Sequence, residues 1–392
     1  MTPVFASGGH DAEAFGASAG YPKGDRATLR EPGFLVGALS HLDELFPSRV
    51  VRKAAMPSSL RHAPGPRITY THKGATLTID DYLARTPTTG LLVARGDTIL
   101  EERYQYGRTD RHRLASFSIA KTVTGMLVGI ALAEGAIRSI DDLAESYVRE
   151  LAGTAYGQTT IRHLLQMSSG VRFSEEYSGT DDMARFTADT YLLRGPGGAA
   201  AVKAFNERQV PAGTRFAYAS PETYVLGLVL RGATGRPAAE YLEAKIWRPM
   251  GAEADATWLI DNSGAEVAYA GLNVVLRDYA RLGLLLARDG NWHGCQIIPA
   301  AWVLDATTVR EDQPHLRPGT ATPVFGYGYQ TWILPTRRRM FLLWGIRGQR
   351  VFVDPENELV MVNTAVHRLP LDLPPLEESG ALWLALVRHF AG

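Results

Sequence analysis

Ser118 and Lys121 are separated by Ile119 and Ala120 in a stretch that reads as the start of a helix. A spacing of three places both side chains on one helix face, one turn apart. A serine hydroxyl is a weak nucleophile until a neighbouring base takes its proton, and an amine can serve as that base. In the first turn, the helix dipole and free backbone N–H groups also favour developing negative charge. The pair therefore indicates a serine nucleophile for acyl transfer.

The spacing alone is a weak signal, since roughly one chain in four of this kind contains Ser-x-x-Lys by chance and a polar helix face explains it equally. Acyl transfer also needs a base, an orienting partner and donors for the oxyanion. A second polar cluster, Tyr218-Ala219-Ser220, leads into a helix at Pro221. A tyrosine beside an ammonium group can carry protons. The alternative is a half-buried aromatic at Tyr218 and a helix cap at Ser220.

Other chemistries find less support in the chain. There is no Gly-x-Ser-x-Gly elbow, which disfavours an α/β-hydrolase, and nothing singles out a histidine for a Ser-His-Asp triad. The histidines lack metal-ligand spacing. The single cysteine, Cys295, excludes an intramolecular disulfide, and we expect it to be a packed thiol. We therefore expect no metal and no cofactor.

The composition is that of an ordinary globular protein of 392 residues, 45% of them hydrophobic. Basic and acidic residues number 41 each, which disfavours a nucleic-acid partner. The first 26 residues lack the basic start and apolar run of a secretory signal, and no apolar stretch is long enough to span a membrane. These features favour a cytoplasmic protein that does not bind membranes.

The elements around the two clusters can be read from periodicity and turn residues. Arg95-Gly96-Asp97 separates two strand-like runs and predicts a hairpin, and Ser116 is a plausible N-cap for the helix that carries Ser118. Thr160 is expected to cap another helix. The predicted strands are 90–94, 98–104, 328–333, 340–344, 350–353 and 359–363, and the predicted helices are 117–134, 161–167, 221–230, 238–247, 270–287 and 381–390.

Strands at both ends around a helical middle predict an α/β (α+β) protein with an inserted helical domain. We expect residues 1–85 to form an N-terminal extension, with few regular elements, packed on the sheet domain. Residues 86–140 and 262–392 would form that sheet domain, and 141–261 the mainly helical domain. The active site would lie at their interface.

Several ordered motifs resemble the serine β-lactamase and penicillin-binding superfamily, on the class C side that includes esterases and 6-aminohexanoate-dimer hydrolases. The resemblance covers residues 88–364. The matching segments are Ser118-x-x-Lys121, Thr160 to Leu165 with Ser169-Gly170, Tyr218-x-Ser220 with Tyr224 to Gly227, Thr234-Gly235, Ile246 to Gly251, Gly326 to Gln330 and Trp344 to Gly348. It implies an antiparallel sheet flanked by helices and an all-helical insertion.

The resemblance also implies roles for particular residues. Ser118 would attack the acyl carbon, and Lys121 and Tyr218 would handle protons, with either of them as the general base. The backbone N–H groups of Ser118 and Ile346 would form the oxyanion hole.

Two departures from the superfamily pattern bear on the substrate. The usual Tyr-x-Asn is Tyr218-x-Ser220, and the usual Lys/His-Thr-Gly is Leu343-Trp344-Gly345, so the cation expected to bind a β-lactam or peptide carboxylate is missing. Arg347 could partly replace it or could point to solvent. Both departures favour an esterase or amidase.

Three stretches most resemble the 6-aminohexanoate-dimer hydrolases: 31–48, 277–283 and 345–349 followed by Asp354-Pro355. In those enzymes a tyrosine contacts the substrate amide, and Tyr177 occupies that place here, with a plain surface aromatic as the alternative. An acidic residue on the same loop can receive a substrate amine, for which Asp181, Asp182 and Asp189 are candidates. We also expect Trp344 to wall the pocket.

The resulting hypothesis is a metal-free serine hydrolase for small esters or secondary amides. Carboxylesterase activity ranks first, hydrolysis of amide oligomers second, and cleavage of β-lactams or D-alanyl-D-alanine peptides third. A non-catalytic binding protein of the same fold is the alternative from another class. The expected partner is a small-molecule substrate, with a homodimer as one arrangement.

Overall fold

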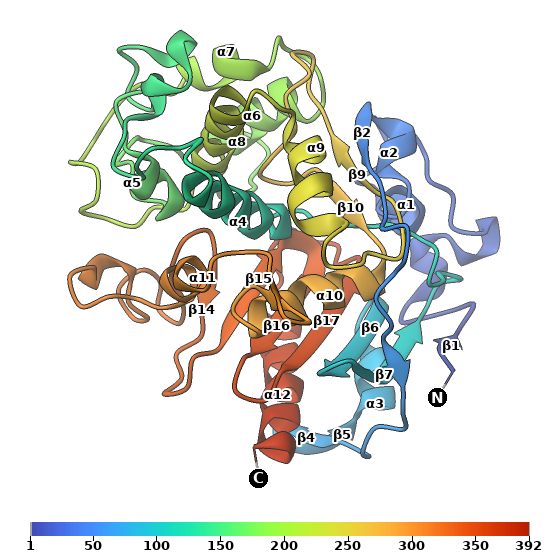
Figure 1. Ribbon diagram of the computed structural model, residues 1–392. Helices are drawn as coiled ribbons and strands as arrows, with labels where there is room; N and C mark the ends of the chain where they lie inside the picture. The colour runs from blue at the N-terminus through green and yellow to red at the C-terminus, as the bar shows by residue number, and fades with distance from the viewer. Residues whose placement is uncertain (1, 392) are drawn as a thin grey trace.

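A large mixed sheet with helices on both faces organises the computed structural model, which describes residues 2–391 (Figure 1). Within those residues nine strands belong to this sheet, in the order β1-β7-β6-β17-β16-β15-β14-β13, with β3 also paired to β7. Their bounds are β1 Val4–Phe5, β3 Arg61–His62, β6 Thr88–Arg95, β7 Thr98–Tyr104, β13 Gly326–Tyr327, β14 Trp332–Ile333, β15 Phe341–Gly345, β16 Gln349–Asp354 and β17 Leu359–Ala365.

The core of the sheet is antiparallel, from β13 through to β7, whereas β1 and β3 pair with β7 in parallel. The β6–β7 hairpin and the strands β15, β16 and β17 confirm the predictions from turn residues. The predicted strand 328–333 is wrong over most of its length, because residues 328–331 form the turn that joins β13 to β14. Pairing of β17 with β6 joins the end of the chain to the first hairpin, which the sequence could not indicate. The fold class is thereby the mixed α/β arrangement expected.

Alternate residues of the central strands enter two separate hydrophobic clusters, because successive side chains of a strand point to opposite faces. Val360 and Val362 of β17 join the cluster that includes the α4 and α10 residues, and Leu359 and Met361 join the cluster on the other face. Every residue of β16 and β17 is buried. Both faces of the sheet are therefore covered by packed side chains. This packing holds β15, the strand that ends beside Ser118, in place.

The α-helices form the layers around the sheet. Their bounds are α1 Pro32–Ala38, α2 Leu42–Leu45, α3 Ile79–Arg85, α4 Ile119–Ala133, α5 Ile161–Leu165, α6 Asp182–Thr190, α7 Gly198–Lys203, α8 Ser220–Thr234, α9 Ala238–Leu242, α10 Leu276–Ala287, α11 Ala300–Thr307 and α12 Leu373–Phe390. Helices α10 and α4 pack on one face. Helix α12 packs on the other, where Trp383 stacks on Phe352 of β16.

Short helical turns complete the chain: η1 Ala12–Phe15, η2 Ala17–Ala19, η3 Ala144–Ser146, η4 Arg149–Leu151, the π-helical η5 Glu243–Trp247, η6 Pro314–Leu316 and η7 Ile346–Gly348. Helices α5 to α9 gather beyond α4, in the green and yellow part of Figure 1, and α8 packs along α4. The Thr160 side chain caps α5 by accepting from the His163 N–H, as predicted.

A second, four-stranded sheet has the order β2-β9-β10-β8, with β2 Ser48–Val51, β9 Ala256–Leu259, β10 Leu272–Val274 and β8 Leu114–Ala115. It links the N-terminal segment to strands on both sides of the helical region. Two hairpins, β4 Thr69–His72 with β5 Ala75–Thr78 and β11 Asn291–Trp292 with β12 Cys295–Gln296, complete the strands.

The first 85 residues contain more regular structure than we expected. They supply three helices, two strands of the large sheet and one strand of the second sheet. Their turn-rich composition concealed these elements, since strands of two to four residues are too short to show a period. The segment is therefore built into both sheets.

Several local expectations differ from the structure. Residues 272–274, expected at the start of a helix 270–287, form β10, and α10 begins only at Leu276. The α4 helix begins two residues later than predicted, so that Ser118 itself is the N-cap, and the Ser116 hydroxyl instead donates to the Phe117 and Ala270 carbonyl oxygens. Cys295 is exposed on the β11–β12 hairpin and is not a packed thiol, because a two-residue strand at the surface offers no core to enter.

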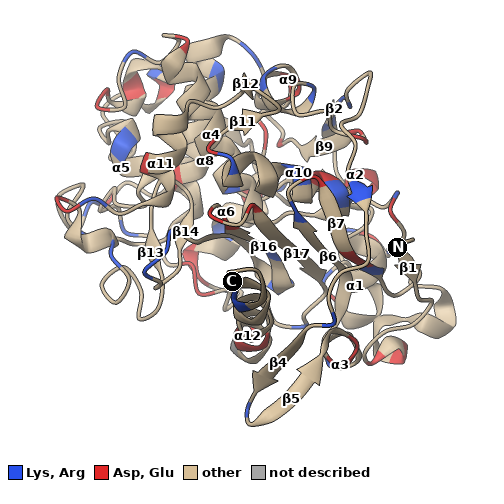
Figure 2. Ribbon diagram, turned by 60° about the horizontal axis from the view of Figure 1, so that its bottom comes forward, with Lys and Arg blue, Asp and Glu red and all other residues tan. Residues whose placement is uncertain are grey.

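Charged residues of both signs are interspersed over the elements, as Figure 2 shows. Among residues 2–391, no helix is both long and apolar enough to cross a bilayer.

Candidate active site

Ser118 lies at the N-terminus of α4, directly after a strained residue. Phe117 has a φ of 43°, a left-handed conformation that costs a bulky residue free energy and that clusters at functional sites. Ser118 has a φ of −67° and a ψ of −5°, and its hydroxyl makes no capping hydrogen bond. The turn therefore leaves the hydroxyl at the positive end of a 15-residue helix.

Lys121 is buried behind Ser118 and makes three hydrogen bonds. Its Nζ atom lies 2.9 Å from Ser118 Oγ, 3.0 Å from Ser220 Oγ and 3.1 Å from the Tyr269 carbonyl oxygen. Burial lowers the pKa of Lys121 to about 8, and the charge of Glu175 opposes that fall. A lysine with this pKa is a free amine in about one molecule in ten at pH 7, far more than an ordinary lysine, and a general base needs that form.

The hydrogen-bond directions around Lys121 are set by Glu175. The Ser220 hydroxyl donates to Glu175 Oε1 at 2.9 Å, and the Ser220 N–H donates to Oε2 at 2.7 Å. The Ser220 hydroxyl donates its only proton to Glu175, so towards Lys121 it can act only as an acceptor. The Tyr269 carbonyl oxygen is likewise only an acceptor. A neutral Lys121 amine thus has both N–H groups committed, which leaves its lone pair for the Ser118 hydroxyl.

Glu175 was not among the residues that the sequence indicated for this site. It lies in the loop between α5 and α6 and also accepts a 2.7 Å hydrogen bond from the Tyr177 hydroxyl. Its position two residues before Tyr177 was the only available signal, and adjacent Glu176 is an equally acidic candidate. The loop folds against the start of α8 so that Glu175 contacts Ser220 while Glu176 stays exposed. This contact depends on tertiary packing, which local sequence patterns do not encode.

Tyr218 lies on the other side of Lys121, on the loop before α8. Its ring centroid is 4.9 Å from Lys121 Nζ, and the ring stacks on Trp332 of β14 at a centroid distance of 5.3 Å. Burial, and secondarily the charge of Glu175, raise the pKa of Tyr218 well above its ordinary value, against a lowering contribution from Ser118. The phenol therefore stays protonated at neutral pH.

The backbone N–H groups of Ser118 and Ile346, predicted to form the oxyanion hole, belong to two chain segments that approach each other closely. Gly345 permits this arrangement, since a Cβ there would lie 2.3 Å from the Ser116 carbonyl oxygen and 3.1 Å from Phe117 Cβ. The end of β15 thus approaches the Ser118 turn more closely than any side chain would allow. Ile346 and Ser118 both line the same cavity.

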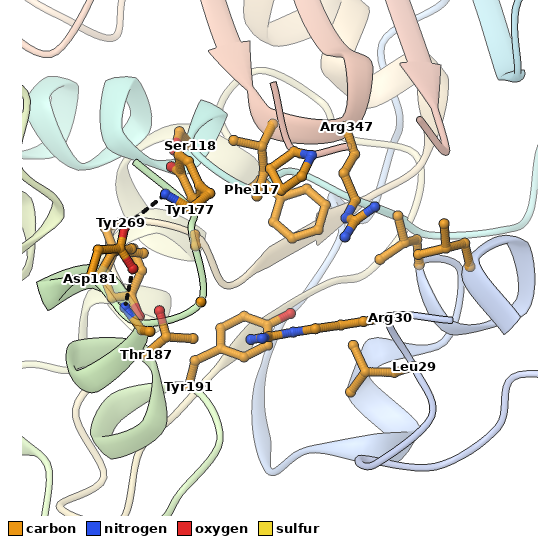
Figure 3. A pocket seen from close by; sticks show the side chains of 18 residues that line it. Leu29, Arg30, Phe117, Ser118, Tyr177, Asp181, Thr187, Tyr191, Tyr269 and Arg347 are labelled. Atoms are coloured by element: carbon orange, nitrogen blue, oxygen red, sulfur yellow. Dashed lines mark hydrogen bonds between the residues drawn. The ribbon is translucent and has the colours of Figure 1, made fainter. Parts of the chain in front are cut away.

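That cavity has a volume of about 290 Å³ and opens beside Ser118 (Figure 3). It is lined by Leu29, Arg30, Leu35, Leu39, Phe117, Ser118, Tyr177, Gly179, Asp181, Met183, Ala184, Thr187, Tyr191, Tyr269, Ala270, Ile346, Arg347 and Pro370. Its walls come from α4, the end of β15, α6 and the N-terminal segment around α1. The first 40 residues therefore contribute to the site.

The structure brings most of the predicted residues together. Lys121 and Ser220 lie behind the cavity wall, and Tyr218 lies beside Lys121. Trp344 differs from the expectation, because it does not line the cavity. It packs on Phe325 and on Trp332, which is the tryptophan that contacts Tyr218.

Tyr177 and Asp181 do line the cavity. Tyr177 has a φ of 57°, and the Asp181 carboxylate accepts from the N–H groups of Glu176 and Tyr177 at 2.7 Å and from Ala184 at 3.1 Å, which caps α6. Asp182 and Asp189, the other two loop candidates, are absent from the lining. Of the three candidates Asp181 is thus the one that lines the cavity, and its carboxylate already accepts from backbone N–H groups.

Arg347 is 9% exposed and faces the cavity, so its side chain does not point to solvent. Its φ of 59° turns the chain after Ile346, and its Nη1 donates to the carbonyl oxygens of His367 and Arg368. For metal binding, no group of three or more His, Cys, Asp and Glu side chains is suitably arranged within residues 2–391.

The sheet, the inserted helices and the Ser-x-x-Lys helix define a hydrolase of the β-lactamase fold. The chain belongs to the Beta-lactamase family, whose model matches residues 76–366.

Individual relatives extend the similarity over nearly the whole chain. A 6-aminohexanoate-dimer hydrolase of Paenarthrobacter ureafaciens is 29% identical over 381 residues, 91% of each chain. The structure of a Bacillus anthracis protein, described as a candidate 6-aminohexanoate-dimer hydrolase, superposes with a TM-score of 0.84 at 24% identity, covering 92% of this chain and 95% of that one. EstCE1, a hydrolase with promiscuous acyltransferase activity, gives 0.59 at 16% identity over 76% and 94%.

Proposed function

We propose that this protein is a serine hydrolase that cleaves small esters or secondary amides through an acyl-enzyme on Ser118. The observation that carries the proposal is the Ser118–Lys121–Ser220–Glu175 hydrogen-bond chain beside an open cavity. A buried amine with a lowered pKa, aimed at a hydroxyl, is the arrangement that activates a serine.

In the proposed mechanism, neutral Lys121 takes the Ser118 proton as Oγ attacks the acyl carbon. The N–H groups of Ser118 and Ile346 stabilise the oxyanion. When the tetrahedral intermediate collapses, the bond to the leaving oxygen or nitrogen breaks and the Tyr218 phenol protonates it, regaining its own proton from the Lys121 ammonium. Water then hydrolyses the acyl-enzyme by the same steps, with Lys121 again as base.

Lys121 is assigned as the base, and not Tyr218, on the direction of their pKa values. Burial favours the neutral form of each group. Neutral lysine is a base, whereas neutral tyrosine is an acid. The raised pKa of Tyr218 therefore supports its role as the proton donor.

An ester or secondary amide is favoured over a β-lactam because Leu343-Trp344-Gly345 supplies no cation where the superfamily pattern has Lys/His-Thr-Gly. The similarity to a 6-aminohexanoate-dimer hydrolase adds amide oligomers as candidates. A cytoplasmic location and a homodimer remain predictions from the sequence.

The test is a panel of p-nitrophenyl acetate, the 6-aminohexanoate dimer and nitrocefin, compared by kcat/KM. We expect turnover of the ester or the amide to exceed that of nitrocefin. Preferential nitrocefin cleavage would contradict the substrate preference, and a protein inert to all three that forms no covalent adduct would favour the non-catalytic alternative.

Changing Glu175 to glutamine is expected to lower kcat/KM about tenfold. It should also move the acid limb of the kcat/KM pH profile, where activity falls as Lys121 is protonated, to lower pH. The fall arises because glutamine keeps only one of the two acceptor oxygens that orient Ser220 and Tyr177. The shift arises because Glu175 raises the pKa of Lys121, so that its removal lets that pKa fall below about 8.

The pH profile of kcat/KM checks this prediction, with Glu176→Gln as the matched control. Glu176 is the exposed neighbour and should show neither change. A loss of activity that is equal at every pH, with the limb in place, would reduce Glu175 to a structural role.

A further inference from the structure

Two arginines enter the cavity that contains Ser118. Arg30 comes from the segment before α1, and Arg347 follows Ile346 at the end of β15. Figure 3 shows both entering from the side of the cavity opposite Asp181, with the Arg30 side chain extending to Tyr191. Burial, and secondarily the charge of Arg30, lower the pKa of Arg347 to about 10. The two cations are therefore close enough to repel each other.

Neither guanidinium has a carboxylate partner within residues 2–391. Arg347 donates only to backbone carbonyl oxygens, and no ion pair includes Arg30. Asp181, the acidic residue of the lining, accepts from three backbone N–H groups. This end of the cavity thus holds one buried and one exposed guanidinium with no carboxylate paired to either, so a bound anion would be favoured there.

A third donor completes this end of the cavity. The charges of Arg30 and Arg347 both lower the pKa of Tyr191, against a larger rise from burial, so its hydroxyl lies within their field and stays protonated. Guanidinium groups offer only donors, and their planar N–H pairs match a carboxylate. Leu29, Leu35 and Phe117 line the same cavity with apolar surface.

We propose that Arg30, Arg347 and Tyr191 bind a carboxylate at the far end of the acyl group of the substrate. The acyl side is assigned because Tyr218, the proposed donor to the leaving group, does not line this cavity. This inference rests on the proposed serine hydrolase function. The substrates that it implies are half-esters and half-amides of aliphatic dicarboxylic acids. The methylene groups would contact the apolar walls between Ser118 and the arginines.

Three 4-nitrophenyl esters of equal chain length test this proposal: the adipate half-ester, the hexanoate and the 6-aminohexanoate. They differ only at the end of the acyl chain that lies away from the ester. That end is a negative carboxylate in the adipate half-ester, a neutral methyl group in the hexanoate and a positive ammonium group in the 6-aminohexanoate. We expect kcat/KM to be highest for the adipate half-ester, by about tenfold over hexanoate, as charge-assisted hydrogen bonds supply. The preference should fall as NaCl is added, because Arg30 is exposed and its charge is screened.

Arg30→Gln should lower the adipate-to-hexanoate ratio of kcat/KM about tenfold, and Arg30→Glu should turn the preference towards the 6-aminohexanoate ester. Arg30 is the main variant, since Arg347 also holds the chain at His367 and Arg368. Arg388→Gln is the matched control, an exposed arginine in the last turn of α12 on the other side of the sheet, and it should leave all three rates unchanged.

Calorimetric binding of adipate and hexanoate to the protein provides a readout that does not depend on turnover. Tighter binding of adipate, weakened by Arg30→Gln, supports the carboxylate site even for a protein that cleaves none of the esters. Such inertness would contradict the serine hydrolase proposal alone. Ester hydrolysis with no preference for adipate in either rate or binding would overturn the carboxylate site and leave the hydrolase proposal standing.

Discussion

Ser118→Ala is expected to lower kcat/KM for a p-nitrophenyl ester by at least about 10⁴-fold, since the covalent path through Oγ disappears. Any remaining rate would come from binding and the two N–H groups of the oxyanion hole. Ser118 makes no capping hydrogen bond, so its hydroxyl is not needed for the α4 helix. Folding should be preserved, and the thermal midpoint of unfolding should match that of the unchanged protein.

Steady-state kinetics and thermal unfolding together check the Ser118 prediction. Ser146→Ala, which alters an exposed serine of η3, is the control for the substitution itself and should retain full activity. A Ser118→Ala protein that turns over the ester as fast as the unchanged protein would remove Ser118 from the mechanism.

Lys121→Met is expected to lower kcat/KM about 10³-fold or more, because Lys121 is the base hydrogen-bonded to the Ser118 hydroxyl and no second one is found within residues 2–391. In the unchanged protein, kcat/KM should rise with pH and reach half its maximum near pH 8, since the active form is the neutral amine and the pKa of Lys121 is about 8. Methionine cannot titrate, so this limb should disappear from the residual activity of the variant.

Stability separates a catalytic role of Lys121 from a structural one. Methionine has a similar volume and ends the cost of burying an amine, but it leaves the Tyr269 carbonyl oxygen without this donor. The two effects oppose each other, so the thermal midpoint should change little. Lys203→Met, at an exposed lysine of α7, should leave both kinetics and stability unchanged. A Lys121→Met protein that keeps its pH limb near 8 would assign that titration to another group.

The elements around the nucleophile could be predicted because they rest on local signals. Turn residues and apolar runs located the β6–β7 hairpin and the last strands, and the three-residue spacing of Ser118 and Lys121 led to a 2.9 Å contact. The order of the motifs indicated that Ser220 lies beside Lys121. The structure places Ser220 Oγ 3.0 Å from Lys121 Nζ, although the two residues are 99 positions apart.

The residues that the sequence did not reveal depend on tertiary packing. Glu175 gains its role because a loop folds against the start of α8, and Arg30 because the N-terminal segment closes one end of the cavity. Trp344 was expected at the pocket, but Trp332 of the neighbouring strand contacts Tyr218 instead. Which of two neighbouring strands carries the tryptophan beside Tyr218 depends on the order of strands in the sheet, and sequence periodicity does not encode that order.

The most direct test of the central claim is intact-mass analysis after reaction with a fluorophosphonate, followed by peptide mapping. We predict a single covalent adduct, located on Ser118 and absent from Ser118→Ala. Slower labelling of Lys121→Met would show that the amine activates the hydroxyl. An adduct on another residue, or equal labelling of the unchanged protein and Ser118→Ala, would contradict the assignment of Ser118 as the nucleophile.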